Sequence, residues 1–126
     1  MSRINIPPLR VIFCRQLMCG ILIWLVSTSA SSQEDIQVGQ GLAHDRNKGN
    51  CLACHLMPTD PTAITSADIG PPLVGMKERY PDKRHLRNVI WNAMEFFPDT
   101  VMPPFGKNGV LTEEELDKVV EYIHRL

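Results

Sequence analysis

The sequence predicts a mainly α-helical domain with long connecting loops. Three segments place apolar residues at helical spacing, and no run shows the alternation expected of a β-strand. The two longest connections are rich in proline, which cannot continue a helix. Loops of this length are uncommon in a compact chain unless they are functional. We therefore expect three principal helices, with the loops wrapped around a bound group.

Residues 35–47 are expected to form the first helix, which contains Gly39 and Gly41. Each glycine lowers the stability of a helix by about 1 kcal/mol. Glycines at such positions usually have a packing reason, so this pair indicates the close approach of another helix. The alternative is a frayed helix without a special contact.

The second helix is expected over residues 81–97, where Pro98 ends it because the residue before a proline is pushed out of the helical region. The third begins after Thr112, which has Glu115 three residues later, as in a capping box. The apolar stripes of the two helices comprise Leu86, Val89, Ile90, Ala93 and Phe97 in the second, and Leu116, Val119, Ile123 and Leu126 in the third.

Residues 1–30 have the three-part layout of a cleaved secretory signal. Three arginines precede a short apolar run, and the small residues at 27–30 favour cleavage after Ala30. The run is shorter than the roughly 20 apolar residues of a membrane span. We therefore expect export to the periplasm without stable membrane insertion.

Two alternatives remain for this leader. It could stay uncleaved as an N-terminal anchor, or Cys19 could carry a lipid. The second alternative is the weaker, because Gln16 and Met18 are poor neighbours for lipid attachment.

Cleavage would leave residues 31–126 as one small domain whose only cysteines are Cys51 and Cys54. A domain of this size often needs a covalent link or a bound group in addition to its core to be stable. Ten Lys and Arg against fourteen Asp and Glu give it a mildly negative charge, unlike a surface that binds nucleic acid.

The run Cys51-Leu52-Ala53-Cys54-His55 is the attachment motif of a c-type haem. Its two thiols can bond the two vinyl groups on one edge of the porphyrin, and the adjacent histidine can then bind the iron. A thioredoxin-like dithiol would want a strand before the motif and an α/β pattern around it. A structural zinc site would need further ligands, and no cysteine follows Cys54. The sequence therefore predicts one covalent haem.

Met102 is the expected second axial ligand, because its proline-rich loop lies far enough along the chain to reach the opposite face of the haem. A soft thioether sulfur favours reduced iron, and Met/His coordination raises the reduction potential. The alternative role for Met102 is filling the core. The other methionines and histidines are weaker candidates: Met57 and Met76 on the His55 side, Met94 in the core, His85 on a basic helix start, and His44 and His124 as surface residues of helices.

Pro71 is expected to support His55. A ligating histidine normally donates its other ring N–H to a carbonyl or carboxylate, and the rigid Gly70-Pro71 turn offers a carbonyl oxygen. An ordinary turn without this role is the alternative.

These features together resemble the class I cytochrome c fold over essentially the whole mature chain. The shared order is a glycine-bearing helix, the Cys-x-x-Cys-His motif, a Gly-Pro-x-Leu-x-Gly segment, a loop methionine and a capped last helix. The resemblance implies that the Pro71 carbonyl accepts a hydrogen bond from His55. It also implies that the first and last helices cross near Gly39, Gly41 and Tyr122.

Three segments, residues 49–55, 69–73 and 98–105, also look like the X subunit of the Sox sulfur-oxidation system. That resemblance implies a periplasmic heterodimer with a second cytochrome, the A subunit. The pair, an L-cysteine S-thiosulfotransferase, couples thiosulfate oxidatively to a cysteine of a carrier protein. The sulfur chemistry would take place on the partner, because no catalytic constellation stands out in this chain.

The expected role is therefore that of a haem c electron-transfer subunit. A free-standing class I cytochrome c that shuttles electrons is the alternative, and the same residues would serve it. A haem enzyme or gas sensor would need an open sixth position on the iron.

Overall fold

The structure, a computed structural model, describes residues 28–65 and 67–126. The chain divides into two units, Met1–Gln33 and Glu34–Leu126, and the site described below lies wholly in the second.

The apolar part of the predicted leader lies outside the described residues, so its cleavage after Ala30 stays a prediction. None of the helices in the described part of the chain has the length and apolar character needed to span a membrane.

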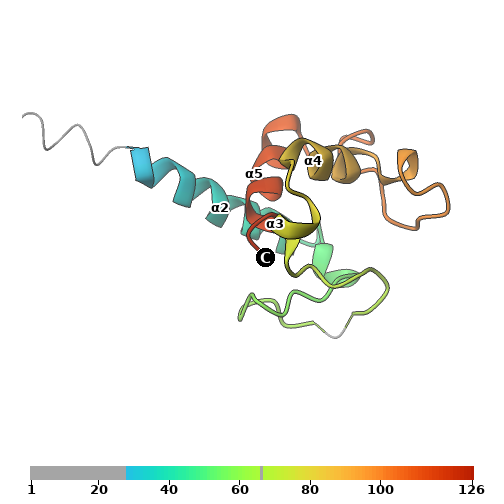
Figure 1. The fold of residues 1–126 in the computed structure, drawn as a ribbon, viewed down its shortest axis with the longest axis horizontal. Helices are drawn as coiled ribbons and strands as arrows, with labels where there is room; N and C mark the ends of the chain where they lie inside the picture. The colour runs from blue at the N-terminus through green and yellow to red at the C-terminus, as the bar shows by residue number, and fades with distance from the viewer. Residues whose placement is uncertain (1–27, 66) are drawn as a thin grey trace, which may run out of the picture. The chain divides into compact units, whose positions relative to one another are not determined.

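The described residues are helical or irregular and contain no strand, as the sequence predicts (Figure 1). The elements are the helices α2 (Thr28–His44), α3 (Met76–Arg79), α4 (Lys83–Trp91) and α5 (Glu113–Ile123), and the 3₁₀ turns η1 (Cys51–Ala53) and η2 (Ala93–Glu95). Long irregular loops join η1 to α3 and η2 to α5.

The helices α2 and α5 touch at Gly39. A Cβ atom placed there would lie 2.0 Å from the carbonyl oxygen of Lys118 and 3.1 Å from Cβ of Tyr122. The predicted crossing at this glycine is therefore confirmed. The expectation was wrong for Gly41, because a Cβ atom there would meet nothing within 4 Å.

The capping box of α5 forms as predicted. The Thr112 hydroxyl accepts a hydrogen bond from the backbone N–H of Glu115, and the Glu115 carboxylate accepts one from the N–H of Thr112. Both contacts satisfy N–H groups that the first turn of a helix leaves without partners.

The second helix is shorter than predicted. It ends at Trp91 because Asn92 adopts a non-helical backbone (φ −152°, ψ 88°) and its side chain donates to Glu95. The expectation that the helix continues to Phe97 was wrong, and so was the placement of Met94 in the core, because Met94 is 52% exposed.

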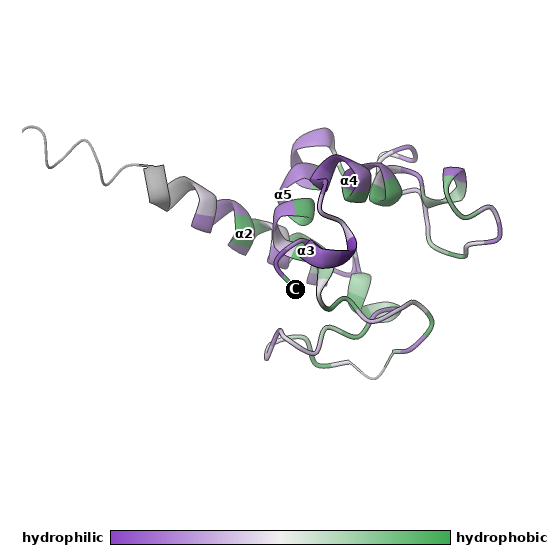
Figure 2. Ribbon diagram, viewed as in Figure 1, coloured by the Kyte–Doolittle hydropathy of each residue, from purple (hydrophilic) through white to green (hydrophobic). Residues whose placement is uncertain are grey.

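The core lies where α4 and α5 pack against the loops. Leu111, Leu116 and Val119 are its largest fully buried side chains. In Figure 2, hydrophobic residues follow the lower edge of α4, toward the loops, and hydrophilic residues follow its upper edge. The buried residues of α4 are Leu86, Val89 and Ile90, and all three line the cavity described below.

Candidate functional site

The haem motif begins at a sharp turn. Asn50 has a left-handed backbone (φ 47°), a conformation that asparagine tolerates better than most residues. Gly49 precedes it, and its N–H donates to the carbonyl of Leu42, 3.0 Å away. A Cβ atom on Gly49 would lie 2.9 Å from that oxygen and 3.2 Å from Sγ of Cys51. The turn therefore brings Cys51 close against the end of α2.

The single turn η1 fixes the spacing of the motif. The N–H groups of Cys54 and His55 both donate to the carbonyl of Cys51, at 3.2 and 2.9 Å. Both cysteines are half-buried, line one cavity and form no disulfide. All three residues of the motif thus contribute to the same cavity wall.

Burial raises the pKa of the Cys51 thiol to about 11, and the neighbouring Cys54 raises it further against a backbone hydrogen bond that lowers it. A thioredoxin-like nucleophile needs the opposite shift. The electrostatics therefore disfavour a redox-active dithiol here.

The His55 ring is held by the turn after the first loop. Its Nδ1 lies 2.7 Å from the carbonyl oxygen of Pro71. A carbonyl can only accept, so Nδ1 carries the hydrogen and donates it, and Nε2 keeps its lone pair for a metal. The contact expected from the sequence is present.

Gly70 packs directly against the same imidazole. A Cβ atom at this position would lie 2.3 Å from Cε1 of His55, so no larger residue fits without moving the ring. The Gly70 N–H also donates to the carbonyl of Cys54 at 2.8 Å. The sequence predicts only a turn at Gly70, and the contact of this glycine with the histidine was not predicted.

Met102 lies on the second long loop and is half-buried in the same cavity. Its N–H donates to the Thr100 hydroxyl at 3.1 Å, and prolines 103 and 104 restrict the backbone that follows. His55 on the first long loop and Met102 on the second therefore line the same cavity.

The loop of Met102 is anchored on the end of α4. A Cβ atom at Gly106 would lie 1.9 Å from Cε3 of Trp91, and the N–H of Lys107 donates to the carbonyl of Trp91 at 3.2 Å. Sequence reasoning missed this contact. The only sequence signal was a lone glycine beside a Pro-Pro pair, which by itself does not identify the residue that packs on it.

The cavity between these walls has a volume of about 430 Å³. This value lies within the range of cavities that hold cofactors and other small ligands, about 300–1,000 Å³. Its lining is mostly apolar and includes all five predicted site residues: Cys51, Cys54, His55, Pro71 and Met102.

The other candidate ligands either contact other side chains or lie outside the cavity. Met76 lines the cavity, but its sulfur accepts a hydrogen bond from Arg79 at 3.3 Å. Met57 is buried, and its sulfur lies 3.3 Å from the hydroxyl oxygen of Tyr122. None of the remaining candidates lines the cavity: Met94, His44, His85 and His124.

Two of these histidines differ from the expectation of surface residues. His124 is buried, and its Nε2 lies 3.0 Å from the carbonyl oxygen of Tyr80. His44 is half-buried beside Tyr122 and Asp60. Both were misjudged because helix position alone does not reveal which chain segment covers a side chain.

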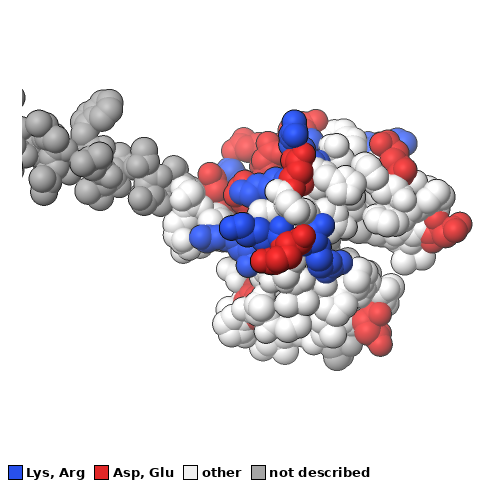
Figure 3. Space-filling model, in the orientation of Figure 1, with Lys and Arg blue, Asp and Glu red and all other residues white. Residues whose placement is uncertain are grey.

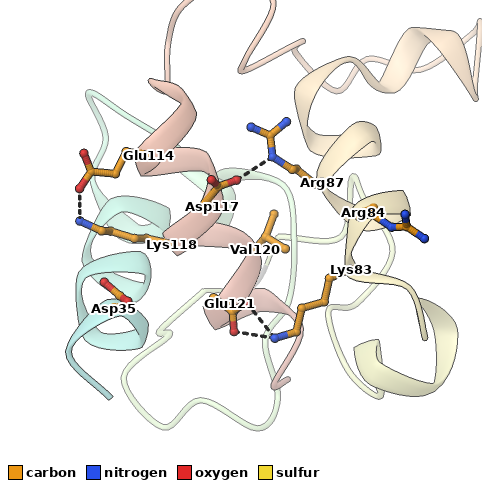
Figure 4. Close-up of a pocket in the computed structure, with 9 residues that line it drawn as sticks. All are labelled: Asp35, Lys83, Arg84, Arg87, Glu114, Asp117, Lys118, Val120 and Glu121. Carbon is orange, nitrogen blue, oxygen red and sulfur yellow. Dashed lines mark hydrogen bonds and ion pairs between the residues drawn. The ribbon is translucent and has the colours of Figure 1, made fainter. Parts of the chain in front are cut away.

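A second hollow, of about 540 Å³, lies along α4 and α5 and is lined by charged residues (Figure 4). Lys83 pairs with Glu121, and Arg87 pairs with Asp117 and Glu113, so the two helices are joined by ion pairs. Because the positive and negative charges there are paired, we interpret the hollow as part of the contact between α4 and α5.

Residues 37–123, more than two thirds of the chain, match the family described as cytochrome c oxidase, cbb3-type, subunit III. The chain belongs to this family. It is a cytochrome c domain with the class I fold, and membership of the family implies covalently attached haem c.

This cytochrome c domain is also similar to an uncharacterized lipoprotein of Aquifex aeolicus (strain VF5). The two are 39% identical over 77 residues, which cover 61% of this chain and 36% of the relative. The chain thus matches about a third of the relative's length.

The lining of the cavity suits a haem. It is mostly apolar, as a porphyrin requires, and two thiols stand on one wall. The anchored His55 offers Nε2, and Met102 offers a sulfur from another loop. These residues could bind the group covalently and supply both axial ligands.

Proposed function

We propose that this cytochrome c domain is the electron-transfer subunit of a periplasmic thiosulfate-oxidising pair. The observation that carries the electron-transfer role is the cavity with His55 and Met102 on two different loops. Haem iron bound by an imidazole and a thioether cycles between its ferric and ferrous forms, one electron at a time. If His55 and Met102 both bind the iron, no open site would remain for a substrate.

Each residue of the site would have a separate role in holding the haem. Cys51 and Cys54 would hold the haem through thioether bonds, which would use both thiols of the mature domain. His55 and Met102 would bind its iron. Pro71 holds the proton of the His55 ring at Nδ1 through a 2.7 Å hydrogen bond, which keeps the ring oriented and its Nε2 basic.

The sulfur-oxidation role rests on the three segments that resemble the X subunit of the Sox system. In this proposal the partner is the cytochrome A subunit, and the carrier protein is contacted indirectly. Joining thiosulfate to a carrier cysteine releases two electrons, which the haem proteins take up one at a time. A single-haem chain without an open iron site suits the accepting part of that reaction.

A free electron shuttle is the second candidate, because the same cavity serves it. The family match is as consistent with this role as with a role in sulfur oxidation. An oxidase that accepts electrons would then be the partner, in place of a thiosulfate-oxidising cytochrome.

Export to the periplasm is part of the proposal. The layout of residues 1–30 supports a leader, and the relative's title supports an exported, lipid-bearing protein. The mass of the mature protein distinguishes the two outcomes. Cleavage after Ala30 gives residues 31–126 plus one haem, whereas lipidation gives a chain that starts at Cys19 and carries acyl groups.

The experiment that tests the role mixes the holo-protein with thiosulfate, a carrier protein and a candidate A-type cytochrome, and follows haem reduction by absorbance. Reduction only when both cytochromes are present, with co-purification of the pair, supports the subunit. A stable pair needs an interface of about 1,000 Å² or more. Rapid exchange with unrelated carriers and no complex supports the shuttle instead.

A further inference from the structure

The loop that bears Met102 is held by a side chain that does not itself line the haem cavity. Trp91, the last residue of α4, is half-buried and is not among the lining residues. Its indole faces Gly106 with Cδ2, Cε3 and Cζ3, all in the six-membered ring, and leaves no room there for a Cβ atom. The Trp91 carbonyl accepts a hydrogen bond from the N–H of Lys107 at 3.2 Å. Both the side chain and the backbone of this tryptophan thus hold the segment that follows Met102.

The connection between this contact and Met102 is short and stiff. Only three residues separate Met102 from Gly106, and two of them are Pro103 and Pro104. Proline fixes its own φ angle and restricts the residue before it, so this connection has few conformations. On the other side of Met102, its N–H donates to the Thr100 hydroxyl at 3.1 Å. A displacement of Gly106 would therefore be passed on to the backbone of Met102.

The indole is in turn held by Arg87, one turn earlier on α4. The Cζ atom of Arg87 lies 5.8 Å from the centroid of the Trp91 ring, within the range of a cation–π contact. The same guanidinium pairs with Asp117 at 2.6 Å, as Figure 4 shows, and with Glu113. Figure 3 shows positive and negative side chains side by side in the upper part of the view, where Figure 1 places α4 and α5. A chain of contacts thus runs from α5 through Arg87 and Trp91 to Gly106.

We propose that Trp91 is a positioning residue for Met102, and that Arg87 fixes the orientation of its ring. The two side chains keep the loop closed, so that the thioether sulfur stays in place as a ligand of the haem iron. Without them the loop opens more often, and another ligand can replace the sulfur. The inference rests on the proposed role of Met102 as an axial ligand. Two residues outside the cavity then control the Met/His coordination that raises the reduction potential.

Binding of free imidazole to the ferric holo-protein measures how easily the sulfur is displaced. Above about pH 8 imidazole is largely uncharged, so the net charge of a variant has little influence on its binding. Its affinity is followed by the loss of the charge-transfer band between methionine sulfur and ferric iron. We expect the affinity to rise about tenfold in Trp91→Leu and about threefold in Arg87→Gln, because the open form is more populated. Arg87→Gln changes a side chain that is 27% exposed, so it tests the contact with the core intact.

Two control variants separate this effect from a general loss of stability. Lys83→Gln breaks another ion pair between α4 and α5, the one with Glu121, one turn before Arg87. Val120→Ala shortens a buried side chain of α5 that does not line the haem cavity. Both controls should bind imidazole with the wild-type affinity. If Val120→Ala raised the affinity as much as Trp91→Leu, general destabilisation would account for the opening, and the proposal would be overturned.

A double substitution shows whether Trp91 acts through Met102. In Met102→Ala imidazole has no sulfur to displace, so adding Trp91→Leu should leave its affinity, followed by absorbance of the haem, unchanged. An equal rise in both backgrounds would show that Trp91 shapes the cavity without holding the methionine, and would overturn the proposal. Wild-type affinity in Trp91→Leu and Arg87→Gln, with the band present, would overturn the positioning role alone. A wild-type protein that lacks the band would overturn both this role and the proposed axial ligand.

Discussion

The hydroxyl of Tyr122 donates a 2.5 Å hydrogen bond to Oδ2 of Asp60, which joins α5 to the loop that follows the haem motif. Gln40 of α2 donates to the same oxygen at 2.8 Å, and Thr62 donates to Oδ1 through its backbone and its hydroxyl. Both Asp60 and Tyr122 are buried. The Asp60 carboxylate thus joins both α2 and α5 to the loop that carries it.

This network makes stability depend on pH. Burial alone would raise the pKa of Asp60, but the hydrogen bonds from Tyr122, Thr62 and Gln40 outweigh it and hold that pKa well below its usual range. The unfolded chain therefore binds a proton at a higher pH than the folded one. The stability that Asp60 contributes is complete above its unfolded pKa of about 3.9 and is lost as the pH falls toward the folded value.

We expect the unfolding free energy of the holo-protein to fall by about 1 kcal/mol more between neutral pH and about pH 3 than that of Asp60→Asn. Urea unfolding at a series of pH values measures the difference. Asp99→Asn, at an exposed aspartate, is the control and should follow the wild-type curve. Parallel curves for the wild type and Asp60→Asn would contradict the prediction.

The crossing of α2 and α5 gives a matched pair of substitutions on one helix. Gly39→Ala should destabilise the protein by several kcal/mol, because the new Cβ atom would overlap the Lys118 backbone. Gly41→Ala should stabilise it by up to about 1 kcal/mol, because alanine favours a helix and nothing blocks the methyl group. Thermal unfolding of both variants measures the two signs. Equal effects would mean that the helices do not meet at Gly39.

Gly70→Ala should disturb the proximal side of the haem without changing any proposed ligand. The methyl group would press on the His55 ring and weaken its hydrogen bond to Pro71. We expect shifted resonances of the axial histidine in the ferric protein and a smaller fraction of six-coordinate haem. Gly41→Ala serves as the control, and a wild-type spectrum for Gly70→Ala would speak against the packing.

Met102 and Met76 are the two methionines that line the cavity, so a pair of substitutions tests which one binds iron. Met102→Ala should abolish the absorption band that arises from charge transfer between methionine sulfur and ferric iron. Met76→Ala should keep the band, although the loss of a buried side chain costs about 2–5 kcal/mol of stability. Loss of the band in Met76→Ala alone would reassign the ligand.

Local signals predicted much of this fold. The capping box at Thr112 and Glu115 depends on two side chains three residues apart, so the sequence contains all of the information. The haem motif is equally local. The end of α4 was missed because Asn92 leaves the helical region while the apolar period continues through Ala93. Periodicity reports which residues face the core, and it does not report backbone breaks.

The contacts that shape the cavity were harder to predict because they join distant segments. Gly106 packs on Trp91, and Gly70 packs on His55, across fifteen residues in each case. A glycine in the sequence shows that some close approach is allowed, but it carries no information about the neighbour. The four-residue helix α3 was missed because a single turn has no detectable period.

The packing at Gly106 limits the order in which substitutions at Gly106 and Trp91 can be tolerated. Any side chain at that position would strike the Trp91 indole, so an exchange at Gly106 becomes tolerable only after a smaller residue has replaced the tryptophan. A deep mutational scan should therefore find the two sites epistatic, with double substitutions surviving where either single one fails. Gly41, which faces open space, should accept nearly every residue in the same scan, apart from proline.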